Sequence, residues 1–174
     1  IRNLRASTLI DTSLIEEYHE DDKRRTVFFA QNTEGKWMKQ RFNNLVNLCF
    51  AGLDADEQIL IRAECYARNG QVRLALDDLN YLLVNRFIEN GYAPYESTDK
   101  EEALHWILTE RRKELVFRGL RWSDLKRLNR DGKNIGLRRK LGKQTYTLPA
   151  NDDRWVFPIP INEINISRIP QNNR

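Results

Sequence analysis

The stretch ERRKELVFRGLRWSDLKRLN, residues 110–129, predicts the end of one helix, a break and the start of a second helix. Gly119 marks the break, because glycine tolerates the left-handed backbone conformation with which many helices end. Beyond it, Trp122, Leu125 and Leu128 recur every three residues, a spacing typical of one face of a helix. Further elements are predicted before and after this pair of helices.

A tight helical hairpin is predicted upstream. Its first helix begins at Asp54, which with Glu57 predicts a capping box, and ends at Asn69 and Gly70. An apolar stripe with helical spacing follows at once, so the two helices must be antiparallel neighbours. The pattern matches half a tetratricopeptide repeat. The matching residues are Ala63, Tyr66, Gly70, Ala75 and Leu79.

A third helix is predicted to start at a second capping box, formed by Thr98 and Glu101, and to continue to Gly119. Together with the helix after Gly119, this gives four helices stacked as a short solenoid-like layer over about residues 54–130. The sequence therefore predicts a mainly α fold, with tetratricopeptide-like helix pairs and short β or extended segments near the N-terminus and the C-terminus. We expect residues 1–174 to form a single domain.

The segments that flank the helices predict turns and short strands. Residues 20–25 read as a charged turn, residues 26–30 as a short strand and residues 37–42 as a second strand. After the helices, residues 131–142 predict a basic surface loop, and residues 145–148 are compatible with a strand.

The last segment, about residues 145–174, predicts an extended docking tail that becomes polar from residue 162 onward. Pro158 and Pro160 each lack a backbone N–H and restrain the residue before them, so this part cannot be helical. The side chains expected to hold the tail against the helices are Trp155, Phe157 and Ile159.

The composition is that of a globular protein, with 40% hydrophobic and 31% charged residues. The net charge is +4, and the basic runs at residues 23–25, 111–113 and 138–140 are short. We interpret these runs as solvated faces or ion-pair partners and predict no nucleic-acid partner, because that would need a concentrated basic face. Cys49 and Cys65 lie in apolar settings without a CxxC pair, which predicts buried free thiols.

The sequence predicts no catalytic residue, cofactor or metal site, and therefore no enzyme. Glu110 and Glu114 lie one turn apart on a single helix, whereas a hydrolase needs carboxylates that converge across a cleft. Arginines surround them, so we predict a structural ion-pair network that links this helix to its neighbours. His19 and His105 have no metal-ligand partner at suitable spacing, and neither a nucleophile elbow nor a phosphate-binding glycine loop is present.

Aromatic side chains are the remaining candidates for ligand contacts, because sugar rings stack on exposed aromatic faces. Trp37, Tyr92 and Tyr95 lie in polar or loop surroundings and are the candidate ligand-binding residues, although packing is the commoner role for such side chains. Trp106, Trp122 and Trp155 fall on apolar helical or docking positions, and we expect them in the core.

Three separated motifs resemble the SusD/RagB-type family of outer-membrane nutrient-binding proteins of Bacteroidetes. Residues 110–127 are similar to the family pattern E-R-R-x-E-L-x-F-E-G-x-R-W-x-D-L-x-R, with Arg118 where an acidic residue is often found. Residues 60–80, LIRAECYARNGQVRLALDDLN, resemble the family's helix pair, and residues 157–164, FPIPINEI, resemble its closing P-I-P-x-x-E-I segment.

The resemblance implies an α-rich fold in a lipid-anchored protein of the outer membrane, at the cell surface. Family members sit on a TonB-dependent (SusC-like) transporter and capture oligosaccharides or other oligomeric nutrients. Members are considerably longer, and this chain begins IRNLRAST without an initiator Met. The resemblance therefore implies a C-terminal part that serves as scaffold and docking surface, with the lipid anchor and most glycan contacts outside it. The alternative is a stand-alone tetratricopeptide-type adaptor that binds other proteins.

Overall fold

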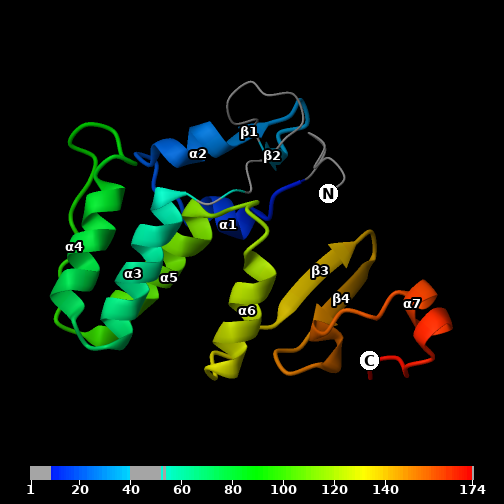
Figure 1. The fold of residues 1–174 in the computed structure, drawn as a ribbon. Helices are drawn as coiled ribbons and strands as arrows, with labels where there is room; N and C mark the ends of the chain where they lie inside the picture. Colours follow the sequence, from blue (N-terminus) through cyan, green and yellow to red (C-terminus); the bar gives the residue numbers. More distant parts are fainter. Residues whose placement is uncertain (1–8, 40–51, 53, 174) are drawn as a thin grey trace. The chain divides into compact units, whose positions relative to one another are not determined.

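The fold is that of a computed structural model, which describes residues 9–39, 52 and 54–173. The chain divides into two compact units, residues 1–119 (unit 1) and residues 120–174 (unit 2), each of which is described by itself. Within the described residues, helices predominate and the strands form two small antiparallel sheets (Figure 1). The predicted mainly α fold is therefore confirmed, whereas the single domain stays a prediction.

Three long helices form the body of unit 1: α3 (Ala55–Arg68), α4 (Val72–Leu83) and α5 (Lys100–Glu114). α3 packs against both α4 and α5, and Gly70 adopts the left-handed conformation that turns the chain from α3 into α4 (Figure 1). The predicted apolar stripes face one another, and small alanines at the contacts let the helices approach closely. The most buried apolar side chains here are Leu60, Ala63, Ala67, Ala75, Leu79, Leu83, Ala103 and Ile107.

The helix ends differ from the predicted capping boxes. Asp54 is the N-cap of α3, but its side chain makes no capping bond and lies 3.4 Å from the guanidinium of Arg118 instead. The N-cap of α5 is Asp99 rather than Thr98, and its carboxylate accepts the N–H of Glu101 at 2.7 Å. α5 also ends at Glu114 instead of continuing to the predicted break, and the following turn contains Phe117 in the left-handed region.

The N-terminal segment of unit 1 contains short elements around a small core of their own. α1 (Thr12–Glu16) and α2 (Lys23–Phe28) are followed by β1 (Phe29–Gln31) and β2 (Trp37–Lys39), which pair antiparallel. Phe117, in the turn after α5, packs against this core. The buried side chains of the core are Ile10, Leu14, Ile15, Tyr18 and Phe29.

Two predictions for this segment are wrong in part. Residues 23–28, predicted as the end of a turn and the start of a strand, form α2, because the carboxylate of Asp22 caps the helix by accepting the N–H of Arg24 at 3.0 Å. The first strand therefore begins only at Phe29. The second predicted strand is confirmed at Trp37–Lys39, and its residues 40–42 lie outside the described part of the chain.

The predicted burial of the cysteines is wrong for Cys65, whose free thiol is exposed. Cys65 lies midway between Ala63 and Ala67, two buried residues one helical turn apart, so it points to the opposite face of α3. Cys49 lies outside the described residues. No helix in the described ranges has the length and apolarity needed to cross a membrane.

Unit 2 begins with α6 (Arg121–Arg130), as predicted, and continues with a hairpin of β3 (Leu137–Leu141) and β4 (Gln144–Leu148). The predicted basic loop is thus wrong in part, because its second half pairs with β4 as a strand. A short 3₁₀ turn, η1 (Asp153–Trp155), precedes the extended proline segment, which is confirmed. The predicted polar tail contains a further helix, α7 (Ile161–Ser167).

Two side-chain clusters organise unit 2. Trp122 of α6 packs between Trp155 and Phe157, with ring centroids 4.6 and 5.0 Å away, respectively, so the predicted contact of the tail with a helix is confirmed for these residues. Phe157 nevertheless remains 67% exposed. Buried Asn129 holds the loop after α6, because its amide oxygen accepts the N–H of Ile135 at 2.6 Å and its amide nitrogen donates to the carbonyls of Ile135 and Ala150 at 2.9 and 3.2 Å, respectively.

Candidate functional site

The two carboxylates of the central motif are buried in unit 1. Glu110 is 1% exposed and Glu114 is also buried, which would be costly for ionised groups without partners. Both bind Arg24 of α2, a residue that is itself 2% exposed. Its Nη2 lies 2.7 Å from Glu110 and its Nη1 lies 2.8 Å from Glu114. The predicted structural ion-pair network is therefore present, and its central cation is Arg24.

Further partners satisfy the rest of this network. Arg24 also binds Asp22 with two parallel bonds, from Nε at 2.9 Å and from Nη2 at 2.7 Å. Lys113 donates to Glu110 at 2.7 Å, while its own backbone carbonyl accepts the hydroxyl of Tyr18 at 2.8 Å. The Tyr18 ring lies 5.1 Å from the Lys113 ammonium, a distance suited to a cation–π contact.

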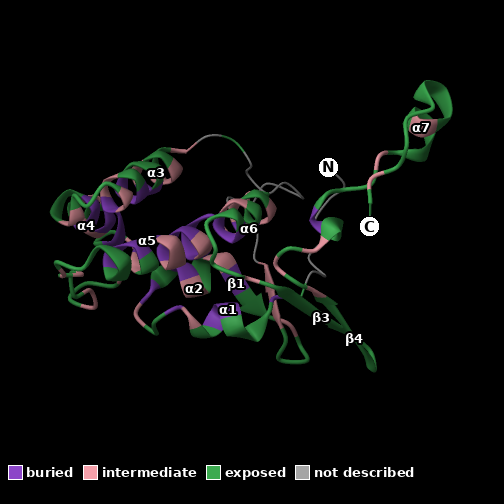
Figure 2. Ribbon diagram, turned by 90° about the horizontal axis from the view of Figure 1, so that it is seen from below, coloured by how far each residue is buried: buried purple, intermediate pink, exposed green. Residues whose placement is uncertain are grey.

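Arg86, which follows α4, extends the network to the helical hairpin. Its Nη2 lies 2.9 Å from Glu114 of α5 and 2.7 Å from Asp56 in the first turn of α3. The connected charges thus tie together α2, α3, α5 and the end of α4. Figure 2 shows this inner region of unit 1 as mainly buried, in purple, with exposed residues on the outer faces of the helices.

The electrostatics favour the ionised forms of two carboxyls in the network, Asp22 and Glu114. Burial favours the neutral form of Asp22, yet the contacts with Arg24 outweigh it and hold the pKa of this carboxyl below its usual value. Burial likewise opposes the charge of Glu114, and the guanidinium groups of Arg86 and Arg24 still lower its pKa. For Tyr18, burial raises the pKa of the phenol. Asp22 and Glu114 are therefore held as anions in ion pairs, an arrangement that favours a scaffold over acid–base chemistry.

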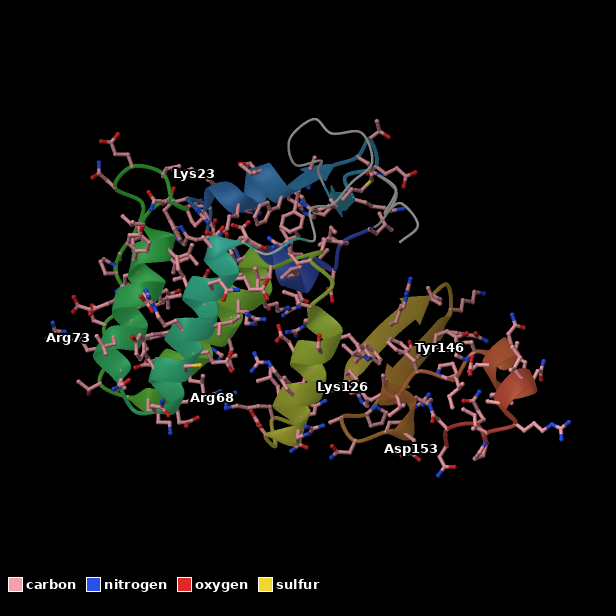
Figure 3. The ribbon with its side chains drawn as sticks, in the orientation of Figure 1. Lys23, Arg68, Arg73, Lys126, Tyr146 and Asp153 are labelled. Carbon is pink, nitrogen blue, oxygen red and sulfur yellow. The ribbon has the colours of Figure 1, made fainter. Side chains whose placement is uncertain are left out.

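Arg24 is the residue that sequence reasoning missed. We interpreted the run at residues 23–25 as a solvated face or as ion-pair partners. For Arg24 the first interpretation is wrong, because its side chain on α2 points into the protein interior. Lys23 remains exposed, as Figure 3 illustrates. The usable signal in the sequence is weak: an N-cap Asp at residue 22, two positions before the arginine.

The aromatic candidates are half-buried and engaged in packing. Trp37 packs against the N-terminal core, with the guanidinium of Arg25 lying 5.7 Å from its ring centroid. Tyr92 and Tyr95 meet at Asn80 of α4, whose amide oxygen accepts the Tyr92 hydroxyl at 2.5 Å and the Tyr95 N–H at 2.9 Å. The structure thus brings two of the three candidates together, while their role as ligand contacts stays a prediction.

Of the three tryptophans predicted in the core, Trp155 is buried, whereas Trp106 and Trp122 are more exposed than expected. Trp106 of α5 is half-buried and stacks on Tyr95, with ring centroids 4.7 Å apart. Trp122 is also half-buried and is covered by the aromatic residues of unit 2 described above. Both therefore serve in packing, as predicted, without being fully enclosed.

The outer side of α4 carries an exposed apolar face. Leu74 and Tyr81 are seven residues apart, and two helical turns place them on the same side of the helix. Tyr81 is 69% exposed, and Val84 and Ile88 continue the exposed apolar series after the helix ends. Exposed apolar side chains on one side of a helix and in the segment after it are typical of a protein–protein contact surface. We call Leu74, Tyr81, Val84 and Ile88 the α4 surface.

Comparisons with known proteins point to one family. The family model described as the SusD family matches residues 57–173. Among solved structures, the chain is similar to a SusD-like carbohydrate binding protein from Bacteroides vulgatus, with 20% identity, a TM-score of 0.65, and coverage of 92% of this chain and 40% of that one. It is also similar to a SusD superfamily protein from Bacteroides fragilis, with 15% identity, a TM-score of 0.62, and coverage of 94% and 40%, respectively.

A second protein from Bacteroides fragilis, described as SusD-like, has a TM-score of 0.55 and 18% identity, and the match covers 97% of this chain and 42% of that one. At these identities the likeness to solved structures shows the fold alone. The chain spans about two fifths of the length of these structures. No curated protein sequence matches it.

Proposed function

Because this chain belongs to the SusD family, we propose that it is the C-terminal part of a nutrient-binding protein at the outer-membrane cell surface, and that the nutrient is a glycan. The description of one solved neighbour as a SusD-like carbohydrate binding protein supports this choice of ligand class. The proposed role is binding and uptake rather than catalysis. Attachment to the membrane would come from a lipid anchor.

Within that protein, this chain acts as scaffold and docking surface, and its partner is a TonB-dependent, SusC-like transporter. The observation that carries this proposal is the α4 surface: exposed apolar side chains on α4 and in the segment after it, while the opposite side of α4 is buried. Exposed Tyr and aliphatic side chains on a rigid element supply contact area at low entropic cost. The buried charge network fixes α3 and α5 behind this helix, which keeps the surface preformed.

Co-purification tests this proposal. We would mix the chain with a purified SusC-like transporter and compare Leu74→Ser/Tyr81→Ser with Val27→Ser, which replaces an exposed apolar residue on α2. We expect wild type and Val27→Ser to be retained by the transporter and the α4 double variant to be released, because central aromatic contacts dominate interface energies.

Two results would count against the proposal. Equal retention of all three proteins would exclude the α4 surface as the docking site. Absence of binding to any SusC-like transporter, together with binding of peptides along the helical hairpin, would instead favour the stand-alone tetratricopeptide-type adaptor.

A further inference from the structure

The β3–β4 hairpin of unit 2 has two faces of different chemistry. The register pairs Arg138 with Thr147 and Lys140 with Thr145, and residues that pair directly share one face of a hairpin. These four residues form what we call the cationic face. The opposite face, which alternates with it along each strand, is largely apolar. Its members are Leu137, Arg139, Leu141, Gln144, Tyr146 and Leu148.

The positive charge of this region is concentrated, and part of it is paired, since Arg127 lies 2.9 Å from Asp124. Residues 126–143 contain eight Lys or Arg residues and one Asp, a local net charge of +7, whereas the whole chain carries +4. Arg138 and Lys140 are exposed, and neither forms an ion pair with a carboxylate in the described part of the chain. Lys126 on α6 is likewise exposed and adds to the same charge (Figure 3).

We infer that the cationic face binds an anionic polysaccharide, one that carries sulfate or carboxylate groups. Arginine guanidinium groups match the oxygen pairs of such anions, and the hydroxyls of Thr145 and Thr147 can donate to sugar or anion oxygens beside them. This inference rests on the proposed carbohydrate-binding function and narrows its ligand class. Charge complementarity supports it, because a polymer with repeated negative charges gains from several exposed cations at once and releases its counterions.

The arrangement of the two faces favours a polysaccharide over other polyanions. A lipid surface would bind the leucines and the cations together. The alternation of side chains along β3 instead places Arg138 and Lys140 on the face opposite to Leu137 and Leu141. Single-stranded nucleic acid would use aromatic stacking beside the cations. Tyr146, the aromatic residue of the hairpin, instead lies on the apolar face, because it pairs with Arg139 and alternates with Thr145 and Thr147.

Affinity measurements on the whole chain test this inference. The probes are heparin, which is sulfated, polygalacturonate, which is carboxylated, and dextran, which is neutral. We would compare wild type with Arg138→Gln/Lys140→Gln and with the control Lys23→Gln/Arg73→Gln, which removes two exposed cations from unit 1. All three proteins should give the same circular dichroism spectrum, because every substituted side chain is exposed.

We expect wild type and the control to bind at least one of the two anionic probes and not dextran. The hairpin variant should lose about tenfold or more in affinity, and the slope of log affinity against log salt should fall by about two, one for each cation removed. An equal loss in the hairpin variant and the control would overturn the inference, because it would indicate diffuse charge attraction.

Two further outcomes would also overturn it. Equal binding to dextran would reject an anionic ligand class while leaving carbohydrate binding intact. Binding only to vesicles of phosphatidylcholine with phosphatidylglycerol, or only to an oligonucleotide, would assign the cationic face to a different polyanion. Failure of the transporter to retain the chain would count against the proposed function alone, since it involves α4 and not this hairpin.

Discussion

Arg24 in unit 1 and Arg138 in unit 2 belong to similar short basic runs, yet the first side chain is buried and the second is exposed. Arg24 is 2% exposed and binds three carboxylates, those of Asp22, Glu110 and Glu114. Arg138 lies on an exposed strand and pairs with no carboxylate in the described part of the chain. The difference shows that burial, rather than the local sequence, decides whether a basic run stabilises the fold or remains available to a partner.

The two environments also imply different energetics. Removing one partner from a buried ionic cluster strands the remaining charges in a medium of low polarity, which costs several kcal/mol. Exposed charges are screened by water and salt, so removing them changes stability little. Four measurements follow from this contrast, and they run from the largest expected effect to the smallest.

The largest effect is expected for Arg24→Met. This change leaves three buried carboxylates with too few cations, so we expect the free energy of unfolding to fall by about 3–5 kcal/mol. Urea denaturation of the whole chain at neutral pH measures it. The control is Lys23→Met, an exposed neighbour in the same run, which should change stability by less than about 0.5 kcal/mol. Equal effects of the two changes would show that the Arg24 side chain is not buried in the ion-pair network as described.

The stabilisation by the same ion-pair network should be lost at low pH. The pKa values of Asp22 and Glu114 are lower in the folded protein than in the unfolded chain. As pH falls, the unfolded chain therefore takes up protons first, so this stability is present above the ordinary carboxyl pKa and is lost below it. We expect the free energy of unfolding to drop below about pH 4, and to drop less in Arg24→Met. Urea titrations over a pH series give this profile, and identical profiles for the two proteins would contradict it.

Unit 2 has a neutral counterpart of the buried network in Asn129. Asn129→Ala leaves the N–H and C=O of Ile135 and the C=O of Ala150 without their partners, so we expect a loss of about 1–3 kcal/mol. Fluorescence of Trp122 and Trp155, which belong to the same unit, follows the unfolding. Asn151→Ala, an exposed position in the following turn, is the control and should leave the midpoint unchanged. A small effect of Asn129→Ala would mean that water replaces its three bonds without cost.

The sequence predicted what local periodicity encodes. The hairpin of α3 and α4 and the start of α6 follow from apolar spacing and from glycines at the turns. The pairing of Glu110 and Glu114 with cations also follows, because buried carboxylates need them. The identity of the cation does not, since Arg24 lies 86 residues from Glu110 along the chain. Only the packing of the N-terminal segment on α5 brings the two together.

Other features escaped prediction because their cause is not local. The stretch LRRKL at β3 has charged residues where a half-buried strand would alternate, and it becomes a strand by pairing with β4 in solvent. α7 follows Pro160, which ends the extended segment and is compatible with a helix start, although the prolines had suggested an extended tail throughout. The candidate ligand residues Trp37, Tyr92 and Tyr95 could be named but not assigned, because exposure alone does not distinguish contact from packing.

The smallest effect is expected for Arg138→Gln/Lys140→Gln. Both side chains are exposed and have no carboxylate partner among the described residues, so their removal should change the free energy of unfolding by less than about 0.5 kcal/mol, in contrast with the single change at Arg24. Urea denaturation followed by the tryptophans of unit 2 measures it. A loss above about 1 kcal/mol would show that the cationic face is held by unseen ion pairs and is not free for a ligand. An unchanged stability would show that these two cations do not stabilise the fold and are available to a ligand, unlike Arg24, whose charge the folded structure requires.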